Sequence, residues 1–282
     1  MLHSDLLYED FAKENTIEKK ENIGTASISR IDLNEELAKK YKRLPGVYYT
    51  IFSDAILKIE KRRYDDLHKA LAKIIKEFIN MYKIKKEDSV FIVGLGNADV
   101  TPDSLGPKVI DMLLVTKHLE KINQLEPNMQ SVIALAPGVM SQTGIESVDI
   151  VSSVVKKEKP KLVIVIDALA ARSMKRLNQT IQITNTAIAP GSGIGNFRKE
   201  FSKATLGTNV LCIGVPTVVD IRSALVELGQ EFFNNKDTIK PFSIEDEKIQ
   251  FMVTPKEVDQ NIIDLAHIIS NGLNLALHNR NF

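Results

Sequence analysis

The chain of 282 residues contains a single cysteine, Cys212. A lone thiol cannot form an internal disulfide, and the sequence has no cluster of Cys and His at zinc-ligand spacing, which fits a reducing cytoplasm. Cys212 stands inside the apolar run 210–214. We therefore expect a small buried side chain there rather than a nucleophile.

Long apolar runs and an excess of charge of either sign are also missing. No stretch reaches the roughly 18 apolar residues of a membrane helix, and residues 1–5 lack the basic and apolar regions of a secretory signal. Lys and Arg number 37 against 36 for Asp and Glu, a net charge of +1. This balance gives no electrostatic reason to expect nucleic acid or an anionic membrane as a partner.

What is present is an alternation of predicted strands and helices. In the segment 161–166, the unbroken apolar run after Lys161 is typical of a parallel strand covered on both faces, and apolar residues recur at helical spacing in 65–82. We expect an α/β fold, a three-layer αβα sandwich with a mostly parallel sheet. The predicted strands are 26–33, 46–52, 89–93, 131–135, 161–166, 180–184, 209–213 and 250–253. The predicted helices are 35–41, 65–82, 105–119, 145–157 and a last one from about 255 through 273.

The N-terminal part differs in composition from the rest. Residues 1 to about 45 are polar and rich in charge, with short alternating pieces that predict strands. We expect a small β-containing segment or flap over 1–60 and an αβα domain over 61–282, folding as one unit.

Three loops of unusual composition follow predicted strands, at 94–107, 167–172 and 189–196. Ligands bind beyond the carboxyl ends of strands in open parallel sheets. Gly94 and Gly96 begin like a dinucleotide fingerprint, but Asp99 occupies the third glycine position and would repel a pyrophosphate. A P-loop pattern is absent, so no cofactor is expected. The glycines either let backbone approach backbone or expose amides to a substrate carbonyl.

Two aspartates give the clearest chemical signal. Asp167 directly follows five apolar residues, so a strand should bring it, partly buried, to the rim of the sheet; burial favours its protonated form. Asp103 stands at the start of a predicted helix, where the ionised form is favoured. Such a pair can activate a water and protonate a leaving amine. Asp103 could instead cap the helix, and Asp167 could be a turn residue at the end of the strand.

Arg172 and the histidines carry less information. Arg172 could hold a substrate carbonyl or carboxylate, or form a structural ion pair. Apart from His3, the histidines fall in predicted helices away from the glycine loops, which argues against a Ser-His-Asp or Cys-His arrangement. They are His68, His118, His267 and His278.

From about residue 3 to its end, the chain resembles the germination protease family. The similarity lies in ordered motifs: Gly-Leu-Gly-Asn at 94–97, Val-Thr-Pro-Asp at 100–103, Ala-Leu-Ala-Pro-Gly-Val-Met at 134–140, Ile-Asp-Ala-Leu-Ala-Ala-Arg-Ser at 166–173, Pro-Gly-Ser-Gly-Ile-Gly-Asn at 190–196 and Gly-Val-Pro-Thr-Val-Val-Asp at 214–220.

This resemblance implies a tetrameric endopeptidase of the spore cytoplasm that degrades small acid-soluble, DNA-coating proteins when germination begins. It implies an αβα fold related to hydrogenase-maturation peptidases and an atypical aspartic mechanism. The family's two essential aspartates fall at Asp103 and Asp167. Around them, we expect the following residues to contact substrate: Gly94, Gly96, Asn97, Asp99, Arg172, Gly191, Ser192, Gly193 and Asn196.

The chain also departs from the family pattern. Asn185 and Ala189 stand where the family usually has an aspartate and a histidine. The family is made as a zymogen, and the nearest match to its processing segment places cleavage between Asp5 and Leu6. Such a cut would remove almost nothing, so we expect propeptide inhibition to be weak or missing.

Two alternatives stay open. Asp99, Asp103 and Asp167 could hold a hard cation in a metal-assisted peptidase. A weakened paralogue that binds spore proteins without cutting them is the second, motivated by Asn185 and Ala189.

Overall fold

The computed structural model describes residues 18–56, 58, 60–191, 199–233 and 251–280. Its strands are β1 (Glu18–Ile23), β2 (Ala26–Leu33), β3 (Gly46–Phe52), β4 (Ser89–Gly94), β5 (Ser131–Leu135), β6 (Leu162–Ala171), β7 (Thr180–Thr184), β8 (Ala187–Ile188), β9 (Phe201–Ser202), β10 (Asn209–Asp220) and β11 (Met252–Val253). Its α-helices are α2 (Glu35–Tyr41), α3 (Tyr64–Met81), α4 (Leu105–Asp111), α5 (Lys117–Lys121), α6 (Met140–Thr143), α7 (Ser147–Glu158), α8 (Lys203–Leu206), α9 (Ile221–Phe233) and α10 (Val258–His278). Short 3-10 turns are η1 (Lys61–Arg63), η2 (Thr101–Asp103) and η3 (Met174–Arg176).

One nine-stranded sheet runs through the molecule in the order β1-β2-β3-β7-β10-β6-β4-β5, with β11 beside β10. The strands β10, β6, β4 and β5 run parallel to one another, whereas β1, β2, β3 and β7 form an antiparallel half that joins β10, and β11 also pairs antiparallel with β10. The α/β fold is therefore confirmed, with a mixed sheet. The N-terminal strands β1–β3 extend this same sheet, and the division of the chain at about residue 60 stays a prediction.

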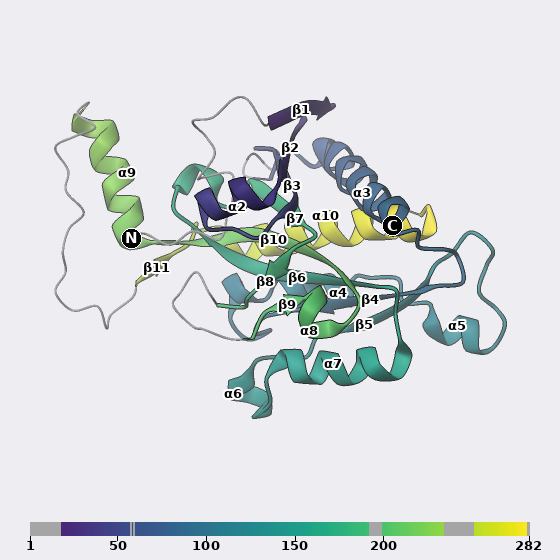
Figure 1. Cartoon of the computed structure of the whole chain (residues 1–282). Coiled ribbons are helices and arrows are strands. Elements are labelled where there is room, and N and C mark those ends of the chain that lie inside the picture. The colour runs from purple at the N-terminus through teal and green to yellow at the C-terminus, as the bar shows by residue number, and fades with distance from the viewer. Residues whose placement is uncertain (1–17, 57, 59, 192–198, 234–250, 281–282) are drawn as a thin grey trace.

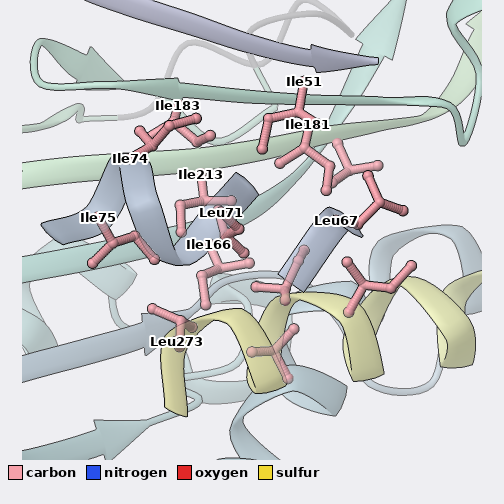
Figure 2. Packing of buried hydrophobic residues seen from close by; sticks show 14 of the residues in the cluster. Ile51, Leu67, Leu71, Ile74, Ile75, Ile166, Ile181, Ile183, Ile213 and Leu273 are labelled. Carbon is pink, nitrogen blue, oxygen red and sulfur yellow. The ribbon is translucent and has the colours of Figure 1, made fainter. Parts of the chain in front are cut away.

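Helices cover both faces of the sheet (Figure 1). The helices α3, α4 and α10 pack on one face over a large core. Figure 2 shows Leu67 and Leu71 of α3 and Leu273 of α10 directed toward sheet residues such as Ile166 and Ile213. A smaller core, built around Val163 and Val165 of β6, lies on the opposite face beneath α7 and α8.

The local sequence explains where these elements begin and end. In α2, the side chain of Asn34 accepts a hydrogen bond from the Leu37 amide at 2.9 Å and caps the first turn. Acidic residues occupy the first turn of α2 and lysines the last, which complements the helix dipole. In α3, apolar residues three and four apart form the stripe that faces the sheet.

The predicted helix 105–119 is wrong as one element. It divides into α4 and α5, and Thr116 lies fully buried before α5. The Thr116 hydroxyl donates to the Gln130 carbonyl at 2.6 Å and accepts from the Val132 amide at 2.9 Å. These bonds hold the segment against β5, so a continuous helix cannot form there. Within the described ranges, no helix is both long and apolar enough to cross a bilayer.

Candidate active site

A cavity of about 310 Å³ lies beyond the carboxyl ends of the parallel strands β4, β6 and β10. Both Asp103 and Asp167 line it, although 64 positions (167 − 103) separate them in the chain. The other lining residues are mostly apolar: Leu95, Gly96, Val100, Pro102, Gly138, Val139, Ser147, Ala168, Leu169, Ala170, Ala189, Pro190, Gly191, Thr217, Val218 and Met252. The structure thus brings the two predicted carboxylates into one largely apolar pocket.

Asp167 lies within β6, which continues to Ala171 instead of ending at residue 166 as the sequence predicted. The backbone of Asp167 pairs with Gly214 of β10, and its side chain is only 4% exposed. Its Oδ1 accepts a hydrogen bond from the Ala168 amide at 2.9 Å. Pairing with β10 at this position holds the carboxylate more rigidly than a loop would.

The thiol of Cys212 lies on β10, the strand that pairs with β6 at Asp167. Cys212 is buried on β10, as predicted. Burial first, and then the charge of Asp167, raises the pKa of the Cys212 thiol. The thiol is therefore kept in its protonated form, which is a poor nucleophile.

Asp103 ends the 3-10 turn η2. Its Oδ2 accepts a hydrogen bond from the Asn97 amide at 2.7 Å. The N-cap position of α4 belongs to Ser104, and the bond from the Asn97 amide ties the carboxylate of Asp103 to the preceding loop.

Glycines let this loop fold onto η2 and α4. Gly96 has a φ of +115°, and a Cβ there would lie 1.9 Å from the Asp103 carbonyl oxygen. A Cβ at Gly94 would lie 2.2 Å from the Gly106 carbonyl oxygen. Of the two roles considered for these glycines, the close approach of backbone to backbone is the one that the geometry demonstrates.

Several predicted substrate contacts lie outside the cavity as the described residues define it. Asn97 and Asp99 both bond the side chain of Gln142, which donates to Asn97 Oδ1 at 2.8 Å and to Asp99 Oδ2 at 3.1 Å. Gly94 and Arg172 also fall outside its lining, whereas Gly96 and Gly191 belong to it. Ser192, Gly193, Asn196, Asp5 and Leu6 lie outside the described residues.

Sequence reasoning missed one side of the cavity. Gly138 and Val139 follow β5, Ser147 begins α7, and Thr217 and Val218 belong to β10. The motifs at 134–140 and 214–220 follow or contain the carboxyl ends of parallel strands, a position that could have indicated these residues.

The structure also locates the carboxylates of the metal hypothesis and the helical histidines. The three carboxylates of the metal hypothesis, Asp99, Asp103 and Asp167, are all described, and the described residues contain no group of three or more His, Cys, Asp and Glu side chains positioned to hold a metal ion. The four helical histidines lie in α3, α5 and α10, and none is among the described residues that line the cavity. Two carboxylates in an apolar pocket remain as the groups able to exchange protons with a bound water.

Comparison with known proteins identifies relatives along nearly the whole chain. A family model described as Germination protease matches residues 8–232 and 243–281. A germination protease from Oceanobacillus iheyensis is 37% identical, with 93% of this chain and 86% of the relative aligned. The Bacillus subtilis germination protease is 38% identical over 94% of this chain and 86% of its own length. A [NiFe] hydrogenase maturation protease, HycI, from Thermococcus kodakarensis overlays 69% of this chain and 98% of its own at 15% identity, with a TM-score of 0.35.

Proposed function

The chain belongs to the germination protease family, and from this premise we propose that it is an endopeptidase that cuts small acid-soluble spore proteins with Asp103 and Asp167 as its catalytic pair. The observation that carries the proposal is that both carboxylates line one cavity at the carboxyl ends of the parallel strands. Family membership supports the substrate class.

In the proposed reaction, a water held between the two carboxylates attacks the carbonyl carbon of the scissile peptide bond. One carboxylate accepts a proton from that water, and the other donates a proton to the amine that leaves. The products are a new carboxyl terminus and a new amino terminus, so atoms and charges balance without a further reactant. The apolar lining excludes bulk water and strengthens the electrostatic interactions of both carboxylates.

The test is digestion of a purified small acid-soluble spore protein by wild type, Asp103→Asn and Asp167→Asn. General acid–base groups contribute about 10²–10⁴-fold to rate, so each variant should lose at least about 100-fold in cleavage rate. Asp111→Asn, an exposed aspartate at the end of α4, is the matched control and should cut like wild type. Undiminished cutting by Asp103→Asn or Asp167→Asn would remove that residue from the mechanism.

A second candidate is a paralogue that binds spore proteins without cutting them. Ala189, which replaces the histidine usual in the family pattern, lines the cavity, so an imidazole at this position would line the cavity that the carboxylates share. Asn185 has a structural role instead, because its Oδ1 accepts the Val47 amide at 2.8 Å. Co-sedimentation of the spore protein with wild type, without discrete fragments, would favour this candidate over the peptidase.

Family membership also supports two further proposals for this chain: assembly as a homotetramer and residence in the cytoplasm of the spore. Adding a chelator to the wild-type digestion tests the metal alternative. A metal-assisted peptidase would stop cutting when its cation is removed.

A further inference from the structure

The strand β10 is irregular at one position beside the cavity. Its parallel register with β6 passes from Pro216 opposite Leu169 directly to Val218 opposite Ala170, so Thr217 is an extra residue without a partner in that ladder. Such a bulge bends a strand and redirects a side chain, and bulges concentrate next to active sites.

The redirected side chain reaches across to the turn that carries Asp103. Thr217 is 1% exposed, and its Oγ1 donates a hydrogen bond to the Pro102 carbonyl at 2.7 Å. Its own carbonyl accepts the hydroxyl of Thr254 at 2.9 Å. Thr217 and Pro102 both line the cavity, so this bond forms part of the cavity wall.

The hydrogen bond from Thr217 satisfies a backbone carbonyl of the turn η2. The backbone hydrogen bonds of η2 run from the Asp103 amide to the Val100 carbonyl at 2.8 Å and from the Ser104 amide to the Thr101 carbonyl at 3.1 Å. The carbonyl between Pro102 and Asp103 receives its donor from Thr217. Pro102 is half-buried, and a carbonyl partly screened from water that loses its donor costs free energy, so the turn would move to regain one.

We propose that Thr217 is a positioning residue that fixes Asp103 relative to Asp167. The bulge lies on β10, and β10 pairs directly with β6, which carries Asp167. Through the Thr217 hydroxyl, the same pair of strands therefore holds both carboxylates, one directly and one through the Pro102 carbonyl. This inference rests on the proposed function, because it assigns a role toward Asp103 in peptide cleavage.

Thr217→Val removes the hydroxyl at nearly constant shape, and Thr217→Ser keeps it. The matched control is Thr208→Val, because the Thr208 hydroxyl makes the same kind of bond, to the Pro160 carbonyl at 2.8 Å, before the other end of β10. A displacement near 1 Å can cost about 100-fold in rate. We expect Thr217→Val to lower kcat by about 10- to 100-fold with KM within about 3-fold of wild type, while Thr217→Ser and Thr208→Val keep kcat within about 3-fold.

Thermal unfolding of each variant separates positioning from folding, and activity is measured well below every transition. If Thr217→Val does not fold, Thr217→Ala compared with Thr217→Ser repeats the test. A kcat of Thr217→Val, or of its alanine substitute, equal to that of Thr208→Val would overturn the inference, as would an equal loss in Thr217→Ser. Asp103→Asn is assayed in parallel: wild-type cutting by that variant refutes the proposed function, whereas an inactive Asp103→Asn beside a fully active Thr217→Val refutes the positioning role alone.

Discussion

Replacing Gly96, a buried glycine in the loop that precedes η2, by alanine should strongly impair catalysis. Gly96 has a φ of +115°, and its new Cβ would stand 1.9 Å from the carbonyl oxygen of Asp103. That oxygen belongs to backbone, so no flexible side chain can move aside. The loop and η2 must therefore separate, and Asp103 moves with them.

The size of the effect follows from the geometry. Real Cβ atoms essentially never come closer than 3.0 Å to such an atom, so the backbone must shift by at least about 1.1 Å (3.0 − 1.9). A displacement near 1 Å at a catalytic group can cost about 100-fold in rate. Backbone strain at positive φ adds about 1–3 kcal/mol, and overpacking adds about 1–3 kcal/mol more, both as loss in the free energy of unfolding.

Two measurements and one control test this reasoning. The rate of spore-protein cleavage reports the position of Asp103, and urea unfolding reports stability. Gly207→Ala is the control: Gly207 also has a positive φ, +68°, but nothing lies within 4 Å of its added Cβ. It should lose about 1–2 kcal/mol from left-handed strain and keep its cleavage rate. Wild-type cleavage by Gly96→Ala, in a variant that folds, would refute the link between this glycine and the position of Asp103.

Two further predictions concern the core. In Gly272→Ala, the new Cβ would lie 2.7 Å from Leu71 Cδ2 between α10 and α3. This overpacking should lower the free energy of unfolding by about 1–3 kcal/mol, less about 1 kcal/mol gained in helix propensity. Urea unfolding measures the loss, and a gain in stability would contradict the prediction. Burial first, and then the charge of His267, lowers the pKa of His68 below its ordinary 6.5. The unfolded chain therefore binds the proton more tightly than the folded protein does, and the free energy of unfolding should fall as pH drops below 6.5. His68→Gln should flatten that dependence in urea titrations between about pH 7.5 and about pH 5.5, and an unchanged slope would show that other groups cause it.

Much of the fold was predictable because apolar runs and periodicity record burial directly. The core of β6 was predicted from five apolar residues, but its end was not, because Asp167 continues the strand as a polar residue paired with Gly214. The edge strand β1 escaped prediction, since its sequence, Glu-Lys-Lys-Glu-Asn-Ile, is almost entirely polar and mostly exposed. Such a strand forms through its pairing with β2, which a local pattern does not encode.

Some residues of the candidate site could likewise be predicted from the sequence, and others could not. Asp103 and Asp167 could be selected from their places after predicted strands and in the motifs, and the structure puts both on one cavity. Thr217 could not be selected, because its direction depends on a shift of register between two strands. Arg172 was selected for its charge, yet the described cavity forms without it.

The walls of the cavity come from segments as far apart as Leu95 and Met252, and α10, the last helix, packs on α3. On the ribosome, N-terminal segments emerge first, so both carboxylates exist in the nascent chain well before their enclosure does. A polypeptide halted before residue 251 would lack both Met252 and the helix that covers Leu71 of α3. The cavity wall at Met252 and the packing of α10 on α3 therefore exist only once residues 251–278 have been made.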